Sequence, residues 1–307
     1  MKTILITGAT GQIGRVLLQR LSGRHNLICV DIVEPDEELR RIVSGQHVSF
    51  YTLDLLKDDL SVIAGSDKVD SLIHLASVVD GSRDVLGKTR DTIELNLFST
   101  INILKMCPGI RHVIFSSSMM VYGLPQFSPI NENHPTLPLD LYGVSKLLVE
   151  EALRIHAQAR GIMLSVLRFT SIYGPGKYSG KSAKRAIPNF IRLARNNESP
   201  VIFSHAIHEK RDYLYIDDAV DAIVLSLTRP FNDVINIGSA RSTTILEVAE
   251  IIVEQCGASR KVVVEQSSIQ SSASSDYLLD IAKAKALIDF SPHVTLEQGL
   301  RAEIEHV

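Results

Sequence analysis

The chain has 307 residues, of which 45% are hydrophobic and 22% charged, a composition typical of a folded globular protein rather than a disordered one. Its 32 basic and 35 acidic side chains give a formal charge of -3, so it has no global basic surface for nucleic acid. No apolar run approaches the roughly eighteen residues that cross a bilayer, and no secretory hydrophobic region begins the sequence. We therefore expect a cytoplasmic protein that binds neither nucleic acid nor membrane.

Short apolar runs alternate with helical patterns through the first half of the chain. The strands are predicted at 4–7, 27–31, 48–53, 71–75, 112–116 and 164–168, and the helices at 12–21, 37–43, 56–64, 84–106 and 142–159. Strands separated by helices imply right-handed crossovers between parallel strands. The pattern predicts an α/β fold with a doubly wound parallel (Rossmann) sheet.

The alternation loosens after Tyr173. We expect a helix at 186–196, short strands at 201–203 and 212–215, a helix at 217–227 and a strand at 234–237 that returns to the main sheet. The serine-rich stretch 267–275 is typical of a loop. This organisation predicts a nucleotide-binding domain over 1–172, with returning segments at about 212–240. Residues 173–211 and 241–307 would form a smaller, discontinuous C-terminal lobe for substrate.

A glycine-rich turn follows the first predicted strand. Gly8, Gly11 and Gly14 are spaced for a tight turn, for close approach of a pyrophosphate, and for packing of a helix whose N-terminus offers unpaired N–H groups. Glycines alone also fit an ordinary strand-to-helix turn. Asp31, at the end of the second strand, favours the cofactor interpretation, because it can accept hydrogen bonds from a ribose and would repel a 2'-phosphate. We expect NAD rather than NADP.

Tyr142 and Lys146 are spaced to share one face of a helix, where an ammonium group can stabilise a phenolate for acid–base work. The spacing also arises by chance, as between Tyr173 and Lys177, where two glycines and Pro175 forbid the helix. Ser118 closes the fifth strand, at the edge where open α/β sheets bind ligands, although serine is also common in turns. The three cysteines form no C-x-x-C pair and the ten histidines show no ligand spacing, so no metal site is expected.

These motifs together resemble the extended short-chain dehydrogenase/reductase family, in its nucleotide-sugar epimerase and dehydratase branch. The resemblance covers nearly the whole chain and implies NAD as cofactor. It implies a catalytic triad of Ser118, Tyr142 and Lys146, with substrate bound by Ser118, Ser171 and Arg211. It assigns cofactor contacts to Gly8, Gly11, Gln12, Ile13, Gly14, Asp31, Asp54, Leu55, Leu75, Ala76, Asn96, Tyr142 and Lys146. It also implies a homodimer formed through the helices at 84–106 and 142–159.

Met119 and Met120 bear on the choice of reaction. Family members that dehydrate a sugar carry an Asp-Glu pair directly after the serine or threonine, and a thioether cannot transfer protons. The expected activity is therefore a sugar epimerase, of UDP-hexose 4-epimerase type. A keto-sugar reductase that releases its product remains an alternative, and a non-catalytic dinucleotide sensor a more distant one.

The substrate lobe departs from the family pattern. Ser204, His205 and Ala206 replace a G-D-G turn, and the run to Asp276 lacks the arginine that family members place on the substrate diphosphate. Arg211 remains as an anion ligand. A cationic cluster at 177–185, made of Lys177, Lys181, Lys184 and Arg185, either supplements Arg211 or is a solvated surface loop.

Overall fold

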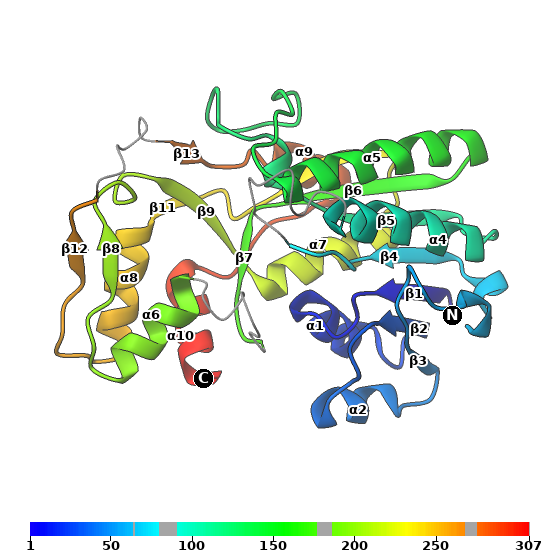
Figure 1. The fold of residues 1–307 in the computed structure, drawn as a ribbon, viewed down its shortest axis with the longest axis horizontal. Coiled ribbons are helices and arrows are strands. Elements are labelled where there is room, and N and C mark those ends of the chain that lie inside the picture. The colour runs from blue at the N-terminus through cyan, green and yellow to red at the C-terminus, as the bar shows by residue number, and fades with distance from the viewer. Residues whose placement is uncertain (64, 80–90, 177–185, 268–274, 307) are drawn as a thin grey trace.

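The centre of the molecule is a seven-stranded sheet in which every pairing is parallel (Figure 1). The computed structural model describes residues 1–63, 65–79, 91–176, 186–267 and 275–306. The strand order is β10-β6-β5-β4-β1-β2-β3. The strands are β1 (Thr3–Thr7), β2 (Asn26–Asp31), β3 (Val48–Thr52), β4 (Ser71–His74), β5 (His112–Ser118), β6 (Met163–Phe169) and β10 (Asp233–Ile237). Their hydrophobic runs are buried because helices cover both faces.

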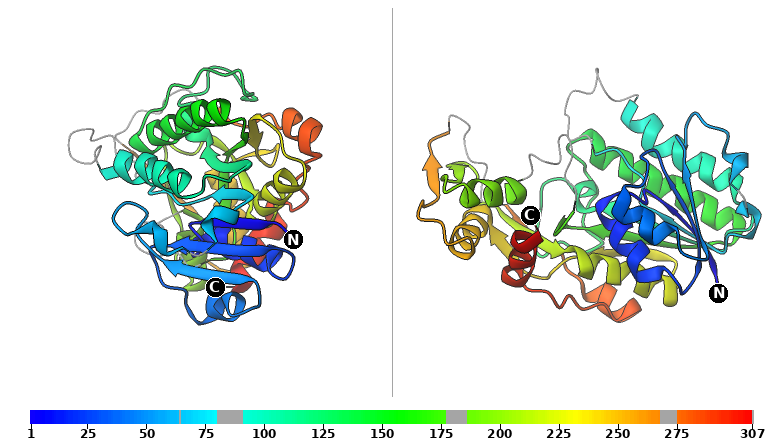
Figure 2. Two further views of the ribbon diagram at one scale, coloured as in Figure 1. Left: turned by 90° about the vertical axis from the view of Figure 1, so that its right-hand side faces the viewer. Right: turned by 90° about the horizontal axis from the view of Figure 1, so that it is seen from below.

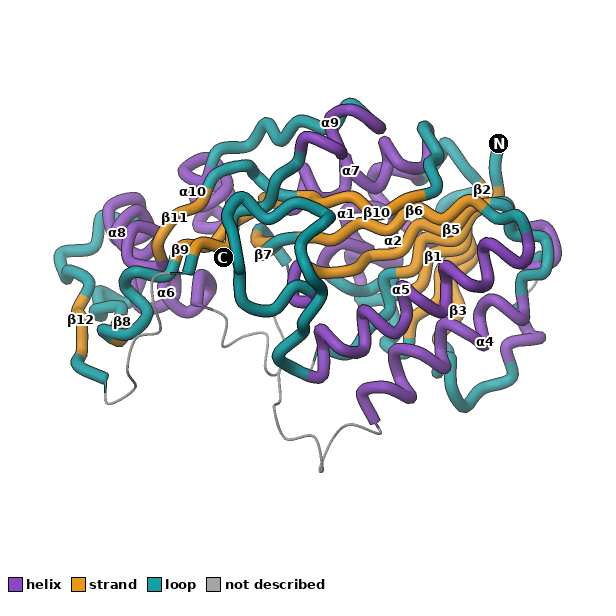
Figure 3. Tube along the Cα trace, turned by 90° about the horizontal axis from the view of Figure 1, so that it is seen from above, coloured by secondary structure: helices purple, strands orange, loops and turns teal. Residues whose placement is uncertain are grey.

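Two apolar cores lie on opposite faces of this sheet. One core packs the strands against α1 (Gln12–Leu21), α2 (Glu37–Val43), α7 (Ile216–Thr228) and α9 (Ala282–Ile288). The other packs them against α4 (Ser99–Met106) and α5 (Leu141–Arg160), which lie side by side in Figure 3. Asp140 caps α5 by accepting a hydrogen bond from the Gly143 N–H, and Gly161 ends it with a φ of 65°. These signals fix where α5 begins and therefore where its first turn lies.

A second lobe is built around a small sheet in which β9 (Lys210–Tyr215) pairs with β7 (Ser171–Tyr173), β11 (Ser242–Thr244) and β13 (Asp276–Tyr277). β8 (Val201–Phe203) and β12 (Val263–Glu265) form a separate pair. A third core joins α6 (Ala186–Arg195), α8 (Ile245–Gln255) and α10 (Leu296–His306). Figure 2 shows the two lobes next to each other in its right-hand panel.

The six predicted strands of the first half are confirmed, and 234–237 does return to the main sheet, as β10 beside β6. The predicted helices at 12–21 and 37–43 match α1 and α2, and α5, α6 and α7 contain the predicted helices at 142–159, 186–196 and 217–227 to within a residue. The strand at 212–215 belongs to β9 in the second sheet, not to the central one. Short backbone turns between residues 203 and 209 come directly before β9.

The helix predicted at 56–64 is wrong. The described residues there form only a 3-10 turn, Leu60–Val62. The carboxylate of Asp54 accepts a hydrogen bond from the Leu56 N–H, and that of Asp59 accepts one from the Ser61 N–H. Such local bonds between side chain and backbone favour turns over a helix. The predicted helix at 84–106 lies partly outside the described residues. Its described part contains a π-helical stretch, Glu94–Phe98, followed by α4.

The predicted serine-rich loop and the cationic cluster at 177–185 fall almost entirely outside the described residues. Among the helices that are described, none combines the length and the apolar character needed to span a membrane.

Candidate active site

A cavity of about 710 Å³ lies at the carboxyl ends of the central strands, facing the second lobe. Its walls come from the glycine-rich turn, the ends of β4, β5 and β6, the start of α5, and the second lobe. The predicted site residues among its lining are Gly8, Gly11, Gln12, Ile13, Gly14, Leu75, Ser118, Tyr142, Lys146, Ser171 and Arg211. Residues predicted separately as cofactor, catalytic and substrate ligands therefore share one space, at the edge where open α/β sheets bind ligands.

The glycine-rich turn has no room for side chains at two positions. Gly8 has a φ of 73°, and a Cβ there would lie 2.7 Å from the Ala76 nitrogen. A Cβ on Gly14 would lie 2.4 Å from the Gly8 carbonyl oxygen. Gly11 is the N-cap of α1, and the first turn of that helix contains no acidic residue. The N-terminus of α1 thus has no side-chain cap and no acidic residue in its first turn, which suits binding of a dinucleotide pyrophosphate.

Asp31 lies beside this turn. Its carboxylate oxygens accept hydrogen bonds from the N–H groups of Thr10, at 2.9 Å, and Val33, at 3.0 Å, which holds the carboxylate at the end of β2. The nearby Arg15 is held by Asp36 through two hydrogen bonds of 3.0 and 2.8 Å. Arg15 is therefore already paired with Asp36 rather than free to bind a 2'-phosphate, which fits NAD.

Five predicted cofactor residues, Asp31, Asp54, Leu55, Ala76 and Asn96, are not among the residues that line the cavity. Asp54 pairs with Lys57 at 3.3 Å, Leu55 packs in a core, and the Ala76 N–H donates to the Thr7 hydroxyl. Buried Asn96 accepts a hydrogen bond from the Val78 N–H and donates one to the Ser145 hydroxyl, each 2.7 Å long. Asn96 therefore links the segment after β4 to the first turns of α5, the helix that carries Tyr142 and Lys146.

Buried His74 completes this support. Its Nδ1 lies 2.7 Å from the Thr7 hydroxyl and its Nε2 lies 2.8 Å from the Thr100 hydroxyl, which itself donates to the Asn96 carbonyl. Because the Thr100 proton is used there, His74 Nε2 donates and Nδ1 accepts. Burial, with a smaller effect of the Lys146 charge, lowers the pKa of His74 to about 3. His74 is therefore neutral and fully bonded.

The three predicted catalytic side chains lie on two neighbouring elements. The Lys146 ammonium donates to the Ser116 carbonyl at 2.7 Å and lies 5.6 Å from the centre of the Tyr142 ring. Burial lowers the pKa of Lys146 to about 7, although the charge of Glu150 opposes this shift. The nearly buried Ser118 hydroxyl accepts the Met120 N–H at 3.2 Å. The cavity thus brings a hydroxyl, a phenol and an ammonium group together.

The second lobe contributes Arg211 from β9 and Ser171 from the start of β7 to the lining of the cavity. Arg211 Nε donates to a Glu209 carboxylate oxygen at 2.5 Å, and the guanidinium lies 5.1 Å from the centre of the Tyr277 ring. Met119 and Met120 also line the cavity, so thioethers occupy the positions after Ser118.

Several lining residues were not predicted, among them Asp140, Thr170, Tyr173, Glu209 and Tyr213. Asp140 was detectable as an N-cap three residues before Gly143. Glu209 lies two residues before Arg211, but its contact with the guanidinium depends on the local turn. Tyr173 and Tyr213 lie in β7 and β9 of the second sheet, and Thr170 immediately precedes β7. No local sequence pattern predicts that these two strands pair.

The family model described as "NAD dependent epimerase/dehydratase family" matches residues 4–238. The chain belongs to this family. It is 30% identical to a Bacillus subtilis protein named as an uncharacterized UDP-glucose epimerase, over 99% of this chain and 97% of the relative. It is 29% identical to the dTDP-4-dehydro-6-deoxyglucose reductase of Escherichia coli, over 99% and 97% of the two chains.

Among solved structures, the chain is similar to the UDP-glucose 4-epimerase of Thermotoga maritima, determined with UDP-glucose. The TM-score is 0.87 at 25% identity, covering 99% of this chain and 98% of that one. The predicted family and fold class are confirmed, including the central Rossmann sheet.

Proposed function

We propose that the protein is an NAD-dependent nucleotide-sugar 4-epimerase. One observation carries the proposal: Ser118, Tyr142 and Lys146 line a single cavity together with the glycine-rich turn and Arg211. The similarity to UDP-glucose epimerases over nearly the whole chain supports the same activity. Met119 and Met120, where dehydratases need carboxyl groups, argue against sugar dehydration.

Each residue has a distinct task in this proposal. Tyr142 removes the proton from the sugar 4-hydroxyl and later returns it, while the Ser118 hydroxyl holds the same oxygen. The Lys146 ammonium stabilises the Tyr142 phenolate and binds the nicotinamide ribose, and Arg211 binds the substrate diphosphate. Bound NAD supplies reversible hydride acceptance at the sugar carbon. The cofactor would be held by the α1 N-terminus and by Asp31.

A keto-sugar reductase is the second candidate, because the reductase from Escherichia coli is similar over the same length. Purified protein should be incubated with NAD and a panel of UDP- and dTDP-hexoses, and separately with NADH and the corresponding 4-keto sugars, with products analysed by NMR. Interconversion of 4-epimers without net NADH formation supports the epimerase. Stoichiometric NADH consumption on a 4-keto sugar, with no interconversion of epimers, would establish the reductase. Binding of NAD without any turnover would support a dinucleotide sensor.

We also propose a division of the chain that follows the sheets. Residues 1–172, with the returning α7 and β10, form the NAD-binding domain, and most of the remainder forms the substrate lobe.

A homodimer through α4 and α5 is supported by a groove between them, whose lining includes Ile101, Leu104, Ile155 and Ile162. Ile155 is 60% exposed, which is large for an isoleucine on a helix. Light scattering on the purified protein tests the dimer. We also propose that the protein is cytoplasmic, which microscopy of a tagged chain tests.

A further inference from the structure

Glu150 lies one helical turn beyond Lys146 on the same face of α5. The two side chains contact consecutive residues of β5. Lys146 donates to the Ser116 carbonyl, and the Ser117 hydroxyl donates to Glu150 Oε1. Ser118, the next residue of the strand, lines the cavity. Helix α5 is therefore attached to β5 at two points immediately before the proposed catalytic serine.

Arg168 holds Glu150 from the neighbouring strand. Residues Ser117 of β5 and Arg168 of β6 are register partners, so both reach the same carboxylate. Arg168 Nε donates to Oε1 at 3.0 Å and its terminal nitrogen donates to Oε2 at 2.6 Å. The two side chains are only 7% and 4% exposed. Such a bidentate pair fixes the orientation of the carboxylate as well as its charge.

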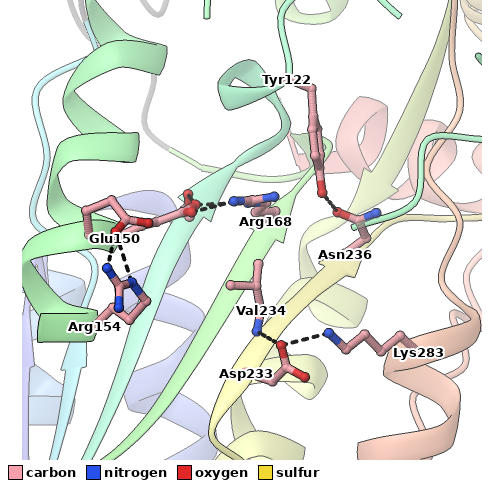
Figure 4. Close-up of polar contacts among 10 residues, drawn as sticks. Tyr122, Glu150, Arg154, Arg168, Asp233, Val234, Asn236 and Lys283 are labelled. Carbon is pink, nitrogen blue, oxygen red and sulfur yellow. Dashed lines mark hydrogen bonds and ion pairs between the residues drawn. The ribbon is translucent and has the colours of Figure 1, made fainter. Parts of the chain in front are cut away.

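The arginine is in turn held by a buried polar network, shown in Figure 4. Its guanidinium carbon lies 4.8 Å from the centre of the Tyr122 ring, and the Tyr122 hydroxyl donates to Asn236 Oδ1 at 2.7 Å. The Asn236 amide donates to the Ile130 carbonyl at 2.9 Å. Strands β5, β6 and β10 therefore all contribute to the placement of Glu150, with little freedom for it to turn away.

The charged and titratable groups around Lys146 come from three elements. On α5 these are Tyr142 and Glu150, on β4 it is His74, and on β6 it is Arg168, which is occupied by Glu150. His74 is neutral and bonded to two threonines. Among the described groups that act on Lys146, Glu150 is the one whose charge favours the ammonium form.

We propose that Glu150 is a positioning residue for the reaction, which sets both the placement and the charge of Lys146. The proposal rests on the proposed function, in which the Lys146 ammonium stabilises the Tyr142 phenolate. In this proposal the Glu150 carboxylate, which does not line the cavity, holds α5 in register against β5. The same carboxylate offsets the unfavourable burial of the Lys146 charge.

The test uses paired substitutions, because Glu150→Gln alone leaves Arg168 as an unpaired buried charge and destabilises the fold. The double variant Glu150→Gln, Arg168→Gln removes both charges together, so it avoids the uncompensated buried charge that makes a single substitution in such a pair strongly destabilising. Glu151→Gln is the matched control. It removes a carboxylate from the adjacent position of α5, where Glu151 and Arg154 form an exposed pair. The readouts are the melting temperature, the pH profile of kcat, and the pKa of Lys146.

The pKa of Lys146 is measured by NMR of lysine labelled with carbon-13 at Cε, and assigned with Lys146→Met. In the double variant we expect a melting temperature near that of the parent protein, a Lys146 pKa lower by about one unit or more, and a pH profile of kcat that moves in the same direction. We expect kcat at neutral pH to fall about fivefold or more, because a one-unit decrease from about 7 lowers the ammonium fraction of Lys146 at pH 7 from about one half to about one tenth. Glu151→Gln should change none of these quantities.

An unchanged Lys146 pKa and kcat in a stably folded double variant would overturn the proposal and leave the pair with a structural role only. The NMR measurement does not depend on the reaction. If the parent protein epimerises no sugar, the proposed function fails, while the effect of Glu150 on Lys146 is still decided by the titration.

Discussion

Glu209 and Arg211 lie two residues apart and form an ion pair of 2.5 Å in the lining of the cavity. Both side chains are partly exposed, at 35% and 39%. Arg211 is the proposed ligand of the substrate diphosphate, so a carboxylate already occupies part of its hydrogen-bonding capacity before substrate arrives. An incoming diphosphate competes with Glu209 and is repelled by it.

Replacing Glu209 by Gln should therefore strengthen the binding of a nucleotide diphosphate sugar. Because exposed ion pairs contribute up to about 1 kcal/mol, we expect KM to fall by up to about fivefold, with kcat almost unchanged. Arg211→Ala is the opposing variant, and should raise KM by about tenfold or more through loss of a charged hydrogen bond. Steady-state kinetics and UDP calorimetry measure both effects. A higher KM in Glu209→Gln would show that the carboxylate helps to bind substrate.

Tyr142→Phe removes one oxygen at the centre of the site. We expect turnover to fall by about 10²- to 10⁴-fold, the usual contribution of a general acid–base group. Binding of NAD should be retained, since the glycine-rich turn and Lys146 are unchanged. Kinetics and NAD calorimetry on the same preparation check the two halves of this prediction. Tyr51→Phe, at a tyrosine of the edge strand β3 that does not line the cavity, is a control for loss of a hydroxyl. Undiminished turnover in Tyr142→Phe would remove the catalytic assignment.

The glycine-rich turn offers a pair of matched substitutions. In Gly14→Ala the new methyl group would lie 2.4 Å from one carbonyl oxygen and 2.7 Å from another, both in the rigid turn. In Gly11→Ala the nearest atom is 3.2 Å away, and its φ of -65° suits alanine. We expect Gly14→Ala to lose roughly 1 to 3 kcal/mol of stability and most of its NAD affinity, as crowded substitutions do. Thermal unfolding should rank Gly11→Ala much nearer the parent, and the reverse order of stability would contradict the packing described. NAD titration should show weaker binding in both variants, because Gly11 lies where the pyrophosphate approaches the backbone.

His74 makes the stability of the protein depend on pH. Burial lowers its pKa from the ordinary 6.5 to about 3, so between these values the unfolded chain binds a proton that the folded chain excludes. The stabilisation is present above pH 6.5 and is lost as pH falls toward 3, at up to about 1.4 kcal/mol per pH unit. His112, with a pKa lowered to about 4 by burial, acts in the same direction.

Denaturant unfolding of the parent and of His74→Gln between pH 7.5 and 4.5 tests this expectation. The variant should be less stable at pH 7.5, because two threonine contacts are lost, but its stability should decrease less steeply with acid. Equal slopes would mean that another group carries the acid sensitivity.

Local signals in the sequence predicted much of the fold and of the site. The glycine spacing, the i,i+4 placement of Tyr142 and Lys146, and the hydrophobic runs are each contained in a few consecutive residues, and all match the structure. The segment at 56–64 shows the limit of this reasoning. Its composition suits a helix, but two aspartates hydrogen-bond to nearby backbone N–H groups and favour turns instead.

Features that depend on register could not be predicted. Glu150 meets Arg168 only because β5 and β6 align Ser117 with Arg168, which depends on the whole sheet. The second sheet combines four short strands from distant parts of the chain, and β7, β11 and β13 are too brief to show a period. Asn96, predicted as a cofactor ligand, is not in the lining of the cavity, and its hydrogen bonds to Val78 and Ser145 link two segments that no local pattern relates.

The chain path also constrains how such a protein can be re-engineered. It changes lobe after β6, after β9, after β10, before α9 and again before α10. β10 completes the central sheet only after the chain has passed through the second lobe. A chimera that takes its substrate-binding half from a relative therefore needs several splice junctions, each crossing a packed boundary. New sugar preferences are more simply obtained by point substitutions around Glu209, Tyr213 and Ser171 than by transplanting a module.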